Sequence, residues 1–221
     1  MVRITWYGHA CFRLEWPGVS VLTDPFDETV GYPLPLEPVD IVTVSHEHYD
    51  HNHTAGLSGE PVILKGLDIS TPPVAQAAGL EITAIPSYHD EVQGQKRGPN
   101  TIFRFDHPQL SVAHLGDLGH LPTPELVARL SGLDLLLVPV GGTYTIDGAQ
   151  AAQLVHEVRP RLVIPMHFQT DALKFKLAEV SSFTRHFTAV SYHGTAEISL
   201  SSAELDSDAT RVVVLDYLSQ V

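Results

Sequence analysis

The sequence is poor in cysteine, in basic residues and in long apolar runs, and each shortage excludes a class of protein. Its 221 residues include one cysteine, Cys11, so no disulfide can form within the chain. This composition fits a reducing compartment and removes thiolates as the main metal ligands. No apolar run approaches the roughly 20 residues that span a bilayer, and the N-terminus lacks a signal-peptide core. We therefore expect a cytoplasmic protein with no membrane partner.

The charge balance is strongly acidic. The chain has 13 Lys and Arg against 26 Asp and Glu, for a formal net charge of -13 with histidine neutral. Nucleic-acid binding is normally driven by Lys and Arg, so this balance argues against nucleic acid and favours a small-molecule substrate. Bound divalent cations would cancel part of the negative charge. The length and the 43% hydrophobic content fit a single domain over residues 1–221, and homo-oligomer formation is left open.

Histidine, in contrast, is abundant, and four of the 13 histidines lie in residues 45–53, Ser-His-Glu-His-Tyr-Asp-His-Asn-His. This segment follows an apolar, β-branched run that predicts a buried strand. Alternate residues of an extended chain point the same way, so His46 and His48 can converge on one ion. Asp50 and His51 come one step later and can reach a second ion. Because imidazole and carboxylate are preferred ligands of zinc, manganese and iron, a metal site is favoured over a solvated polar loop.

The string His46-x-His48-x-Asp50-His51 after a hydrophobic strand resembles the signature of the metallo-β-lactamase superfamily. The opening Gly8-His9-Ala10-Cys11 is similar to the Gly-His-x-Cys/Ser opening of the lactonase-like branch that includes the ascorbate-phosphate lactonases. The resemblance implies an α+β / α/β fold, a four-layer αββα sandwich of two mixed sheets flanked by helices, with the metal site at one edge of the sheets. His9 either approaches that site or is a hydrogen-bonded structural histidine.

Further candidate ligands follow predicted strands elsewhere in the chain. His89, Asp117 and His167 each come just after such a strand, so we expect these strand ends to meet at one edge. The resemblance implies two divalent cations: one held by His46, His48 and His89, a second held by Asp50, His51 and His167, and Asp117 as the bridge. Asp24, which also ends a strand, either caps a turn or orients a ligand histidine without touching the ion.

The rest of the chain predicts short strands and a few helices. Predicted strands are residues 2–6, 11–16, 19–23, 40–44, 61–65, 80–86, 101–105, 110–115, 134–140, 161–165, 188–192, 196–200 and 211–215. Helical turns are predicted at residues 74–78, and helices at 124–130, 148–158 and 171–180. Thr123 and Asp147 are predicted to cap the helices that follow them.

The resemblance also implies a mechanism. Two cations roughly 3.5 to 4 Å apart would share a water and lower its pKa towards about 7, giving a metal-bridged hydroxide that cleaves an ester, lactone or phosphodiester bond. Asp50 could orient this water. Tyr144, in a glycine loop after a buried strand, either donates a hydrogen bond to the developing oxyanion or packs its ring against the loop. Lys96 and Arg97, in the loop after His89, either attract an anionic substrate group or are simply solvated.

The sequence is compatible with more than one function. Other members of the superfamily are phosphodiesterases or nucleases, so the metal core does not name the substrate. A flavodiiron-type redox centre is disfavoured, because such centres usually have Glu where this chain has His48 and need an appended flavin domain, for which 221 residues leave no space. A metal-binding module without catalysis is a third alternative. Zinc is the expected metal, with manganese or iron as alternatives, because His and Asp suit all three.

Overall fold

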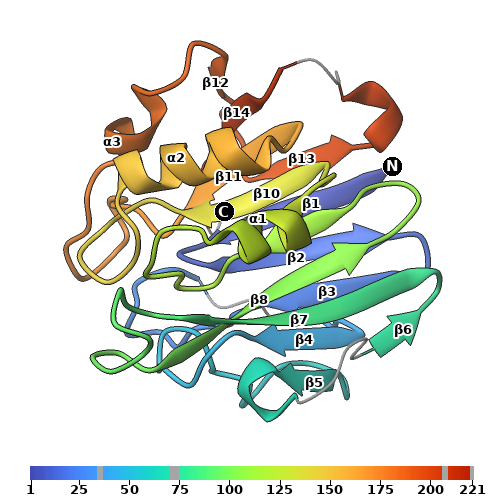
Figure 1. The fold of residues 1–221 in the computed structure, drawn as a ribbon. Coiled ribbons are helices and arrows are strands. Elements are labelled where there is room, and N and C mark those ends of the chain that lie inside the picture. Colours follow the sequence, from blue (N-terminus) through green and yellow to red (C-terminus); the bar gives the residue numbers. More distant parts are fainter. Residues whose placement is uncertain (34–36, 70–74, 206–208, 220–221) are drawn as a thin grey trace.

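The computed structural model describes residues 1–33, 37–69, 75–205 and 209–219, which form two mixed β-sheets packed face to face (Figure 1). The six-stranded sheet has the order β13 (Glu197–Leu200), β1 (Val2–Gly8), β2 (Cys11–Trp16), β3 (Val19–Thr23), β4 (Ile41–Val44), β5 (Val62–Lys65). The eight-stranded sheet has the order β12 (Val190–Tyr192), β14 (Arg211–Val214), β11 (Leu162–Met166), β10 (Leu135–Pro139), β9 (Val112–His114), β8 (Pro99–Asp106), β7 (Leu80–Tyr88), β6 (Ala75–Ala77).

The two faces of the six-stranded sheet contribute to different hydrophobic clusters. Ile4 and Phe12 belong to the main core between the sheets, together with the strands of the eight-stranded sheet. Leu22 and Val42 point the other way, into a smaller cluster around Phe26. This division follows from the two-residue period of a β-strand, which sends successive side chains to opposite faces.

Helices cover the outer face of the eight-stranded sheet (Figure 1). They are α1 (Pro124–Leu130), α2 (Gly148–Val158) and the short α3 (Ser181–Thr184), with 3₁₀ turns η1 (Gly66–Asp68) and η2 (Ser202–Glu204) elsewhere. The predicted caps are confirmed: Thr123 Oγ1 accepts from Leu126 N, and Asp147 forms a capping box with Gln150. None of the helices in the described ranges is both long and apolar enough to cross a bilayer. The predicted fold class, two mixed sheets with flanking helices, is confirmed.

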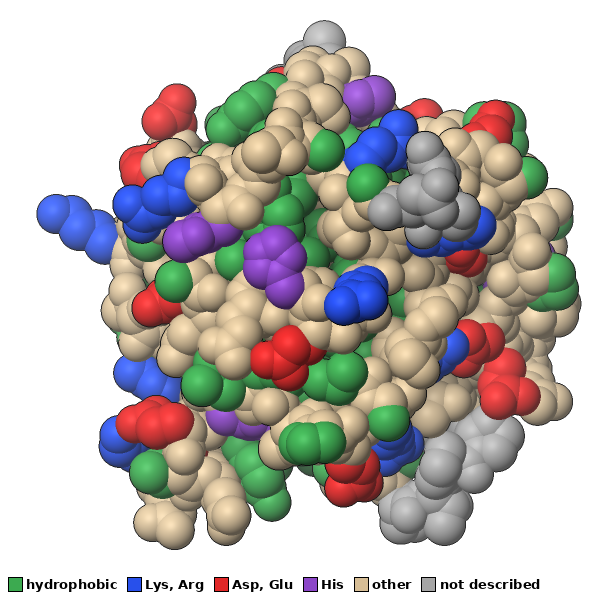
Figure 2. All heavy atoms as spheres, turned by 45° about the horizontal axis from the view of Figure 1, so that its top comes forward, with side chains coloured by type: hydrophobic (Ala, Val, Ile, Leu, Met, Phe, Trp, Pro, Cys, Tyr) green, Lys and Arg blue, Asp and Glu red, His purple; other side chains and the backbone are tan. Residues whose placement is uncertain are grey.

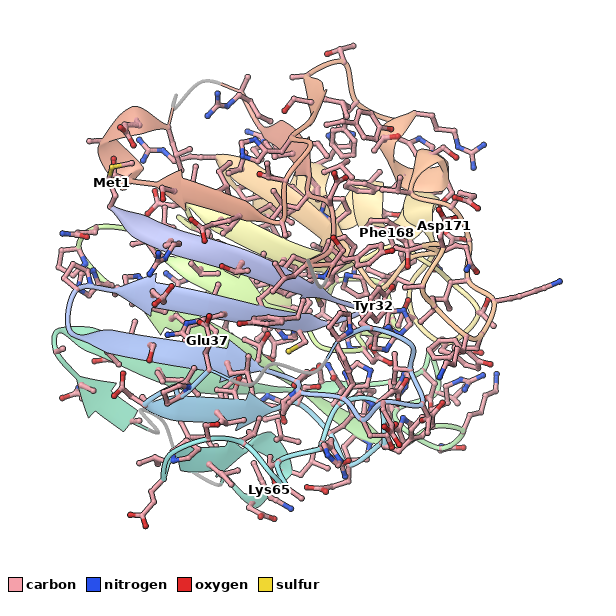
Figure 3. All side chains as sticks on the ribbon, turned by 180° about the vertical axis from the view of Figure 1, so that it is seen from behind. Met1, Tyr32, Glu37, Lys65, Phe168 and Asp171 are labelled. Carbon is pink, nitrogen blue, oxygen red and sulfur yellow. The ribbon has the colours of Figure 1, made fainter. Side chains whose placement is uncertain are left out.

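Figure 3 views the six-stranded sheet from behind and shows loops, with no helix among the described residues, in front of β1 to β4. Tyr32 and Phe168 are labelled there near the end of β1. Phe26, Leu173 and Leu177 also pack into the cluster on this side of the sheet. The outer face of this sheet is therefore closed mainly by loop side chains.

The helical turns predicted at residues 74–78 are wrong. Residues 75–77 form strand β6, which pairs antiparallel with β7, while residue 74 lies outside the described residues. Ala78 and Gly79 make the tight turn between them, with φ of 49° and 83°. The pairing of the two strands across this turn outweighs the helix propensity of alanine.

The helix predicted at residues 171–180 is also wrong, because its backbone groups bond to distant parts of the chain. Lys174 N donates to Val30 O at 3.1 Å, and Ala178 N donates to Gly141 O at 2.9 Å. Leu173 and Leu177 are buried in the loop-covered cluster behind the six-stranded sheet. Tertiary hydrogen bonds and burial therefore hold the segment in a non-helical conformation.

Candidate metal centre

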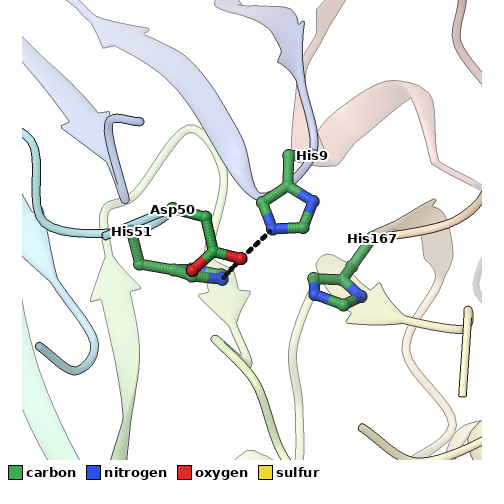
Figure 4. Close-up of side chains that lie close together, drawn as sticks. All are labelled: His9, Asp50, His51 and His167. Carbon is green, nitrogen blue, oxygen red and sulfur yellow. Dashed lines mark hydrogen bonds and ion pairs between the residues drawn. The ribbon is translucent and has the colours of Figure 1, made fainter. Parts of the chain in front are cut away.

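The ends of β4, β7, β9 and β11 bring the predicted ligands together, as the sequence led us to expect. Three groups of side chains have potential ligand atoms within 4.8 Å of one another, and two of them carry the predicted ligands. His46, His48 and His89 form the first group, and His9, Asp50, His51 and His167 form the second (Figure 4); Asp24 forms the remaining group with His46 and His51. The first group comes from β4 and β7, which belong to different sheets. The site therefore lies where the edges of both sheets meet.

Asp117 lies between the two groups and turns one oxygen toward each. Its Oδ2 is 3.2 Å from His89 Nε2 and 3.9 Å from His46 Nε2. Its Oδ1 is 3.3 Å from His51 Nε2 and 3.4 Å from His167 Nε2. A carboxylate that bridges two cations needs this division of its oxygens.

The backbone around Asp117 is fixed by a buried residue that the sequence did not single out, Asn100. Asn100 Oδ1 accepts a hydrogen bond from Asp117 N at 3.0 Å, and its Nδ2 donates to Leu115 O at 3.0 Å. Gly116 permits this approach, because it has φ of 53° and an added Cβ would lie 2.4 Å from Asn100 Oδ1. An asparagine directly before the predicted strand at residues 101–105 was the signal that could have found it.

Asp24 is hydrogen-bonded to one histidine of each group, directly to His51 and through Ser45 to His46. Asp24 Oδ2 accepts from His51 Nδ1 at 2.9 Å and from Ser45 Oγ at 2.5 Å. Ser45 Oγ, having given its proton to Asp24, accepts from His46 Nδ1 at 2.9 Å. These bonds assign the Nδ1–H tautomer to both rings and leave the two Nε2 atoms facing the site. This is the arrangement in which an outer carboxylate orients a metal ligand.

The electrostatics of the site favour added positive charge. Burial disfavours a charged His51, but the carboxylates of Asp117, Asp24 and Asp50 outweigh it and raise the pKa of His51 well above its ordinary value. Burial and the neighbouring His51 lower the pKa of His46 to about 3. Neutral His46 can donate a lone pair to a metal ion, and the negative charge of the carboxylates around His51 stabilises a cation at that position.

Several polar atoms at this site are buried without a hydrogen-bond partner among the described residues. They include His51 Nε2, His167 Nε2 and Asp117 Oδ1, which face one another. Such atoms are costly to bury unless something satisfies them. Divalent cations bound by imidazole nitrogens and carboxylate oxygens would do so. Cys11 is buried and its pKa is raised by burial, so it offers no thiolate here.

A pocket of about 300 Å³ opens over the two groups. Its lining comprises His48, Tyr49, Asp50, His89, Arg97, Asp117, Tyr144 and Phe175. The guanidinium of Arg97 lies 4.7 Å from the ring centroid of Tyr144, so the two side chains stack at the pocket wall. Tyr49 and Phe175 add two aromatic rings that the sequence did not flag, and Phe175 escaped notice because its segment was predicted as a helix.

Lys96 does not join Arg97 in the pocket. Its ammonium pairs with Glu91, both side chains are largely exposed, and Lys96 is absent from the pocket lining. Asp90 accepts hydrogen bonds from the backbone N–H groups of both Lys96 and Arg97 and so fixes the turn, yet of these two side chains the pocket lining includes Arg97 alone. The structure therefore separates two residues that the sequence had grouped.

A profile of the beta-lactamase superfamily domain matches residues 3–167, from the first strand to the last predicted ligand. The chain belongs to the metallo-β-lactamase superfamily. The profile ends at His167, so the part of the chain that it matches carries all the predicted metal ligands.

Relatives in this superfamily resemble the chain over most of its length. A Nitratidesulfovibrio vulgaris protein named "UPF0173 metal-dependent hydrolase" is 32% identical over 199 residues, covering 76% of this chain and 80% of that protein. A Thermotoga maritima structure, described as a candidate Zn-dependent hydrolase of the superfamily, is 35% identical with a TM-score of 0.80, covering 99% and 100% of the two chains. Igni18, a metallo hydrolase from Ignicoccus hospitalis, is 25% identical with a TM-score of 0.63, covering 83% and 89%.

The superfamily is thus confirmed, whereas the lactonase-like branch stays a prediction. The Gly8-His9 opening that suggested this branch does approach the site, since His9 belongs to the second group of side chains. The sequence did not decide whether His9 approaches the site or is a structural histidine.

Proposed function

We propose that this protein is a metal-dependent hydrolase that holds two divalent cations, zinc being favoured, and cleaves an ester, lactone or phosphodiester bond in a small anionic substrate. The observation that carries the proposal is Asp117, whose two oxygens face two separate groups of imidazoles on the floor of a pocket. His46, His48 and His89 would hold one cation, Asp50, His51 and His167 the other, and Asp117 both.

When bound, such cations would acidify a water molecule and polarise the bond under attack. The chain's own residues supply the rest. Asp50 lines the pocket together with His48 and His89, and its carboxylate can accept a hydrogen bond from the attacking water and orient it. Tyr144 also lines the pocket with its side chain partly exposed, so its phenol can donate to the oxygen that gains charge.

The pocket lining supports an amphipathic substrate. Arg97 supplies the one cationic side chain of the lining, and a guanidinium is suited to carboxylate or phosphate. Tyr49, Tyr144 and Phe175 give the same pocket three aromatic walls. A volume near 300 Å³ is at the lower end for small-molecule sites. A small substrate with an acidic group near Arg97 and an apolar part against the rings fits this lining.

A nuclease is less well supported. On the face that Figure 2 shows, Lys and Arg side chains of the described residues are scattered among acidic and uncharged ones, and the chain as a whole carries a net charge of -13. A continuous basic path for a phosphate backbone is the usual requirement. The names of the relatives above, metal-dependent hydrolase and Zn-dependent hydrolase, support hydrolysis without naming a substrate.

The test is a metal-dependent activity screen. Protein stripped with a chelator and reloaded with zinc, manganese or iron is assayed against lactones, thioesters, carboxylic esters and phosphodiesters, each with and without an acidic group. We expect turnover that returns on reloading, favours acidic substrates and is abolished in Asp117→Asn. Two bound ions without turnover of any substrate class would instead identify a metal-binding module.

A further inference from the structure

His9 lies in the second group of side chains in a conformation that its surroundings enforce. It is fully buried at the turn after β1 and has φ of 51°, a region that few residues other than glycine adopt. Its carbonyl oxygen accepts from Trp6 Nε1 and from His167 N, both at 3.1 Å. The preceding Gly8 has no side chain to collide with the ring of Tyr32, where an added Cβ would lie at 2.3 Å. The turn therefore carries His9 to a fixed position.

The imidazole of His9 is held on several sides. Its Nε2 lies 3.2 Å from Asp50 Oδ2, the contact drawn in Figure 4. Its ring packs against His167, with centroids 4.2 Å apart, and meets the edge of Phe175 at 5.5 Å. A side chain so constrained can hold the Asp50 carboxylate in one orientation.

We propose that His9 is a positioning residue for the second cation: its Nε2–H donates to Asp50 Oδ2 and its carbonyl anchors His167, while the ring itself does not bind the ion. This inference rests on the two-cation site of the proposed function. Outer partners of this kind fix the orientation of ligating carboxylates and histidines.

The distances separate His9 from the ligands of its own group. His51 and His167 each place Nε2 within 3.4 Å of Asp117 Oδ1. No ring nitrogen of His9 comes within 4 Å of Asp117, and within the part of the chain that the structure describes its carboxylate contact is with Asp50. Asp50 Oδ2 lies between His9 Nε2 and His51 Nε2, at 3.2 and 3.8 Å (Figure 4). His9 thus contacts the predicted ligand Asp50 and not the bridging Asp117.

Two substitutions test the donor. His9→Phe keeps a ring of similar size and deletes the N–H, whereas His9→Gln keeps an N–H donor near the position of Nε2. Zinc titrations against a competing chelator should show the second zinc bound about 10- to 100-fold more weakly in His9→Phe, with the first unchanged and most of the loss restored in His9→Gln. His156→Phe, on α2 against Phe187, is the matched control and should bind both ions as wild type does. Unchanged affinity for the second zinc in His9→Phe would overturn the proposal.

A second measurement on the wild-type chain does not depend on a buried variant folding. With an NMR-active cadmium isotope in the site and labelled histidine nitrogens, we expect metal–nitrogen coupling at His51 and His167, none at His9, and a proton retained on His9 Nε2. Coupling to His9 would make it a ligand and overturn the proposal, as would a wild-type chain that takes up no second ion. Two bound ions without hydrolysis would contradict the proposed function alone.

Discussion

Asp24 Oδ2 lies 2.9 Å from His51 Nδ1, and both side chains are fully buried. The same oxygen accepts the hydroxyl of Ser45, which in turn receives the Nδ1–H of His46. One carboxylate outside the metal site therefore sets the tautomer of a histidine in each group. The two halves of the centre share a single structural support.

Asp24→Asn tests this support. The amide keeps the volume but loses the charge and one acceptor oxygen, so His51 and His46 would be held less firmly. We expect both ions to bind about 10- to 100-fold more weakly in chelator-competition titrations. Asp40→Asn is the control, because Asp40 also bonds a serine, Ser20, but at the exposed beginning of β4. Equal affinities in the two variants would show that Asp24 does not support the site.

Arg97 and Lys96 provide a matched pair for the substrate. Arg97 lines the pocket, whereas Lys96 pairs with Glu91 outside it. Arg97→Ala should raise KM for an acidic substrate about 10- to 100-fold with a smaller effect on kcat, since a lost charged hydrogen bond costs about 1.5–3 kcal/mol. Lys96→Ala should leave both constants near wild type. A preference for neutral substrates, or equal effects of the two substitutions, would rule out an anion site at Arg97.

Tyr144 is 38% exposed and stacks under Arg97 at the pocket wall. Tyr144→Phe keeps the ring for that stacking and deletes only the hydroxyl. A hydroxyl that donates to the developing oxyanion should show a fall in kcat on the order of a hundredfold, with metal content and KM little changed. Wild-type turnover in this variant would leave Tyr144 a packing role alone.

Asp134 links the beginnings of three strands far from the metal centre. It accepts from Ser111 N at 2.9 Å, from Arg161 Nη1 at 2.9 Å and from Ser202 Oγ at 2.8 Å. Burial opposes its charge, but these hydrogen bonds prevail and lower its pKa. A lowered pKa stabilises the fold above the ordinary aspartate value near 3.9, and this contribution is lost as pH falls below it.

Asp134→Asn should therefore lower the free energy of unfolding at pH 7 by about 1–3 kcal/mol in urea titrations. The difference from wild type should shrink as pH falls below about 4. Metal affinity should be unchanged. A difference that stays constant down to pH 3 would show that the charge of Asp134 contributes nothing.

Much of the fold and the site could be predicted, because the signals are local. Alternation of apolar residues marked the strands, and Thr123 and Asp147 marked the helix starts. A histidine at the end of a predicted strand, together with the family resemblance, marked His89 and His167, and the structure brings both to the same edge. Their roles as ligands stay predictions.

The misses share a different cause: contacts between residues distant in sequence. Phe175 reaches the pocket because its segment bonds to Val30 and Gly141, which no local pattern reveals. Asn100 anchors Asp117 from 17 residues away. Lys96 and Arg97 lie in a turn that hydrogen bonds to Asp90 fix, and the positive charges of the two residues do not reveal the geometry of that turn.

The most direct test of the two-cation centre is the metal content of purified protein under metal excess, compared across single-ligand variants. We expect two ions per chain, weaker binding of one ion in His46→Ala or His89→Ala, and weaker binding of both in Asp117→Ala, because Asp117 turns one oxygen toward each group. The two-cation centre would be contradicted if the chain bound a single ion under metal excess and the His167→Ala variant bound that ion equally well.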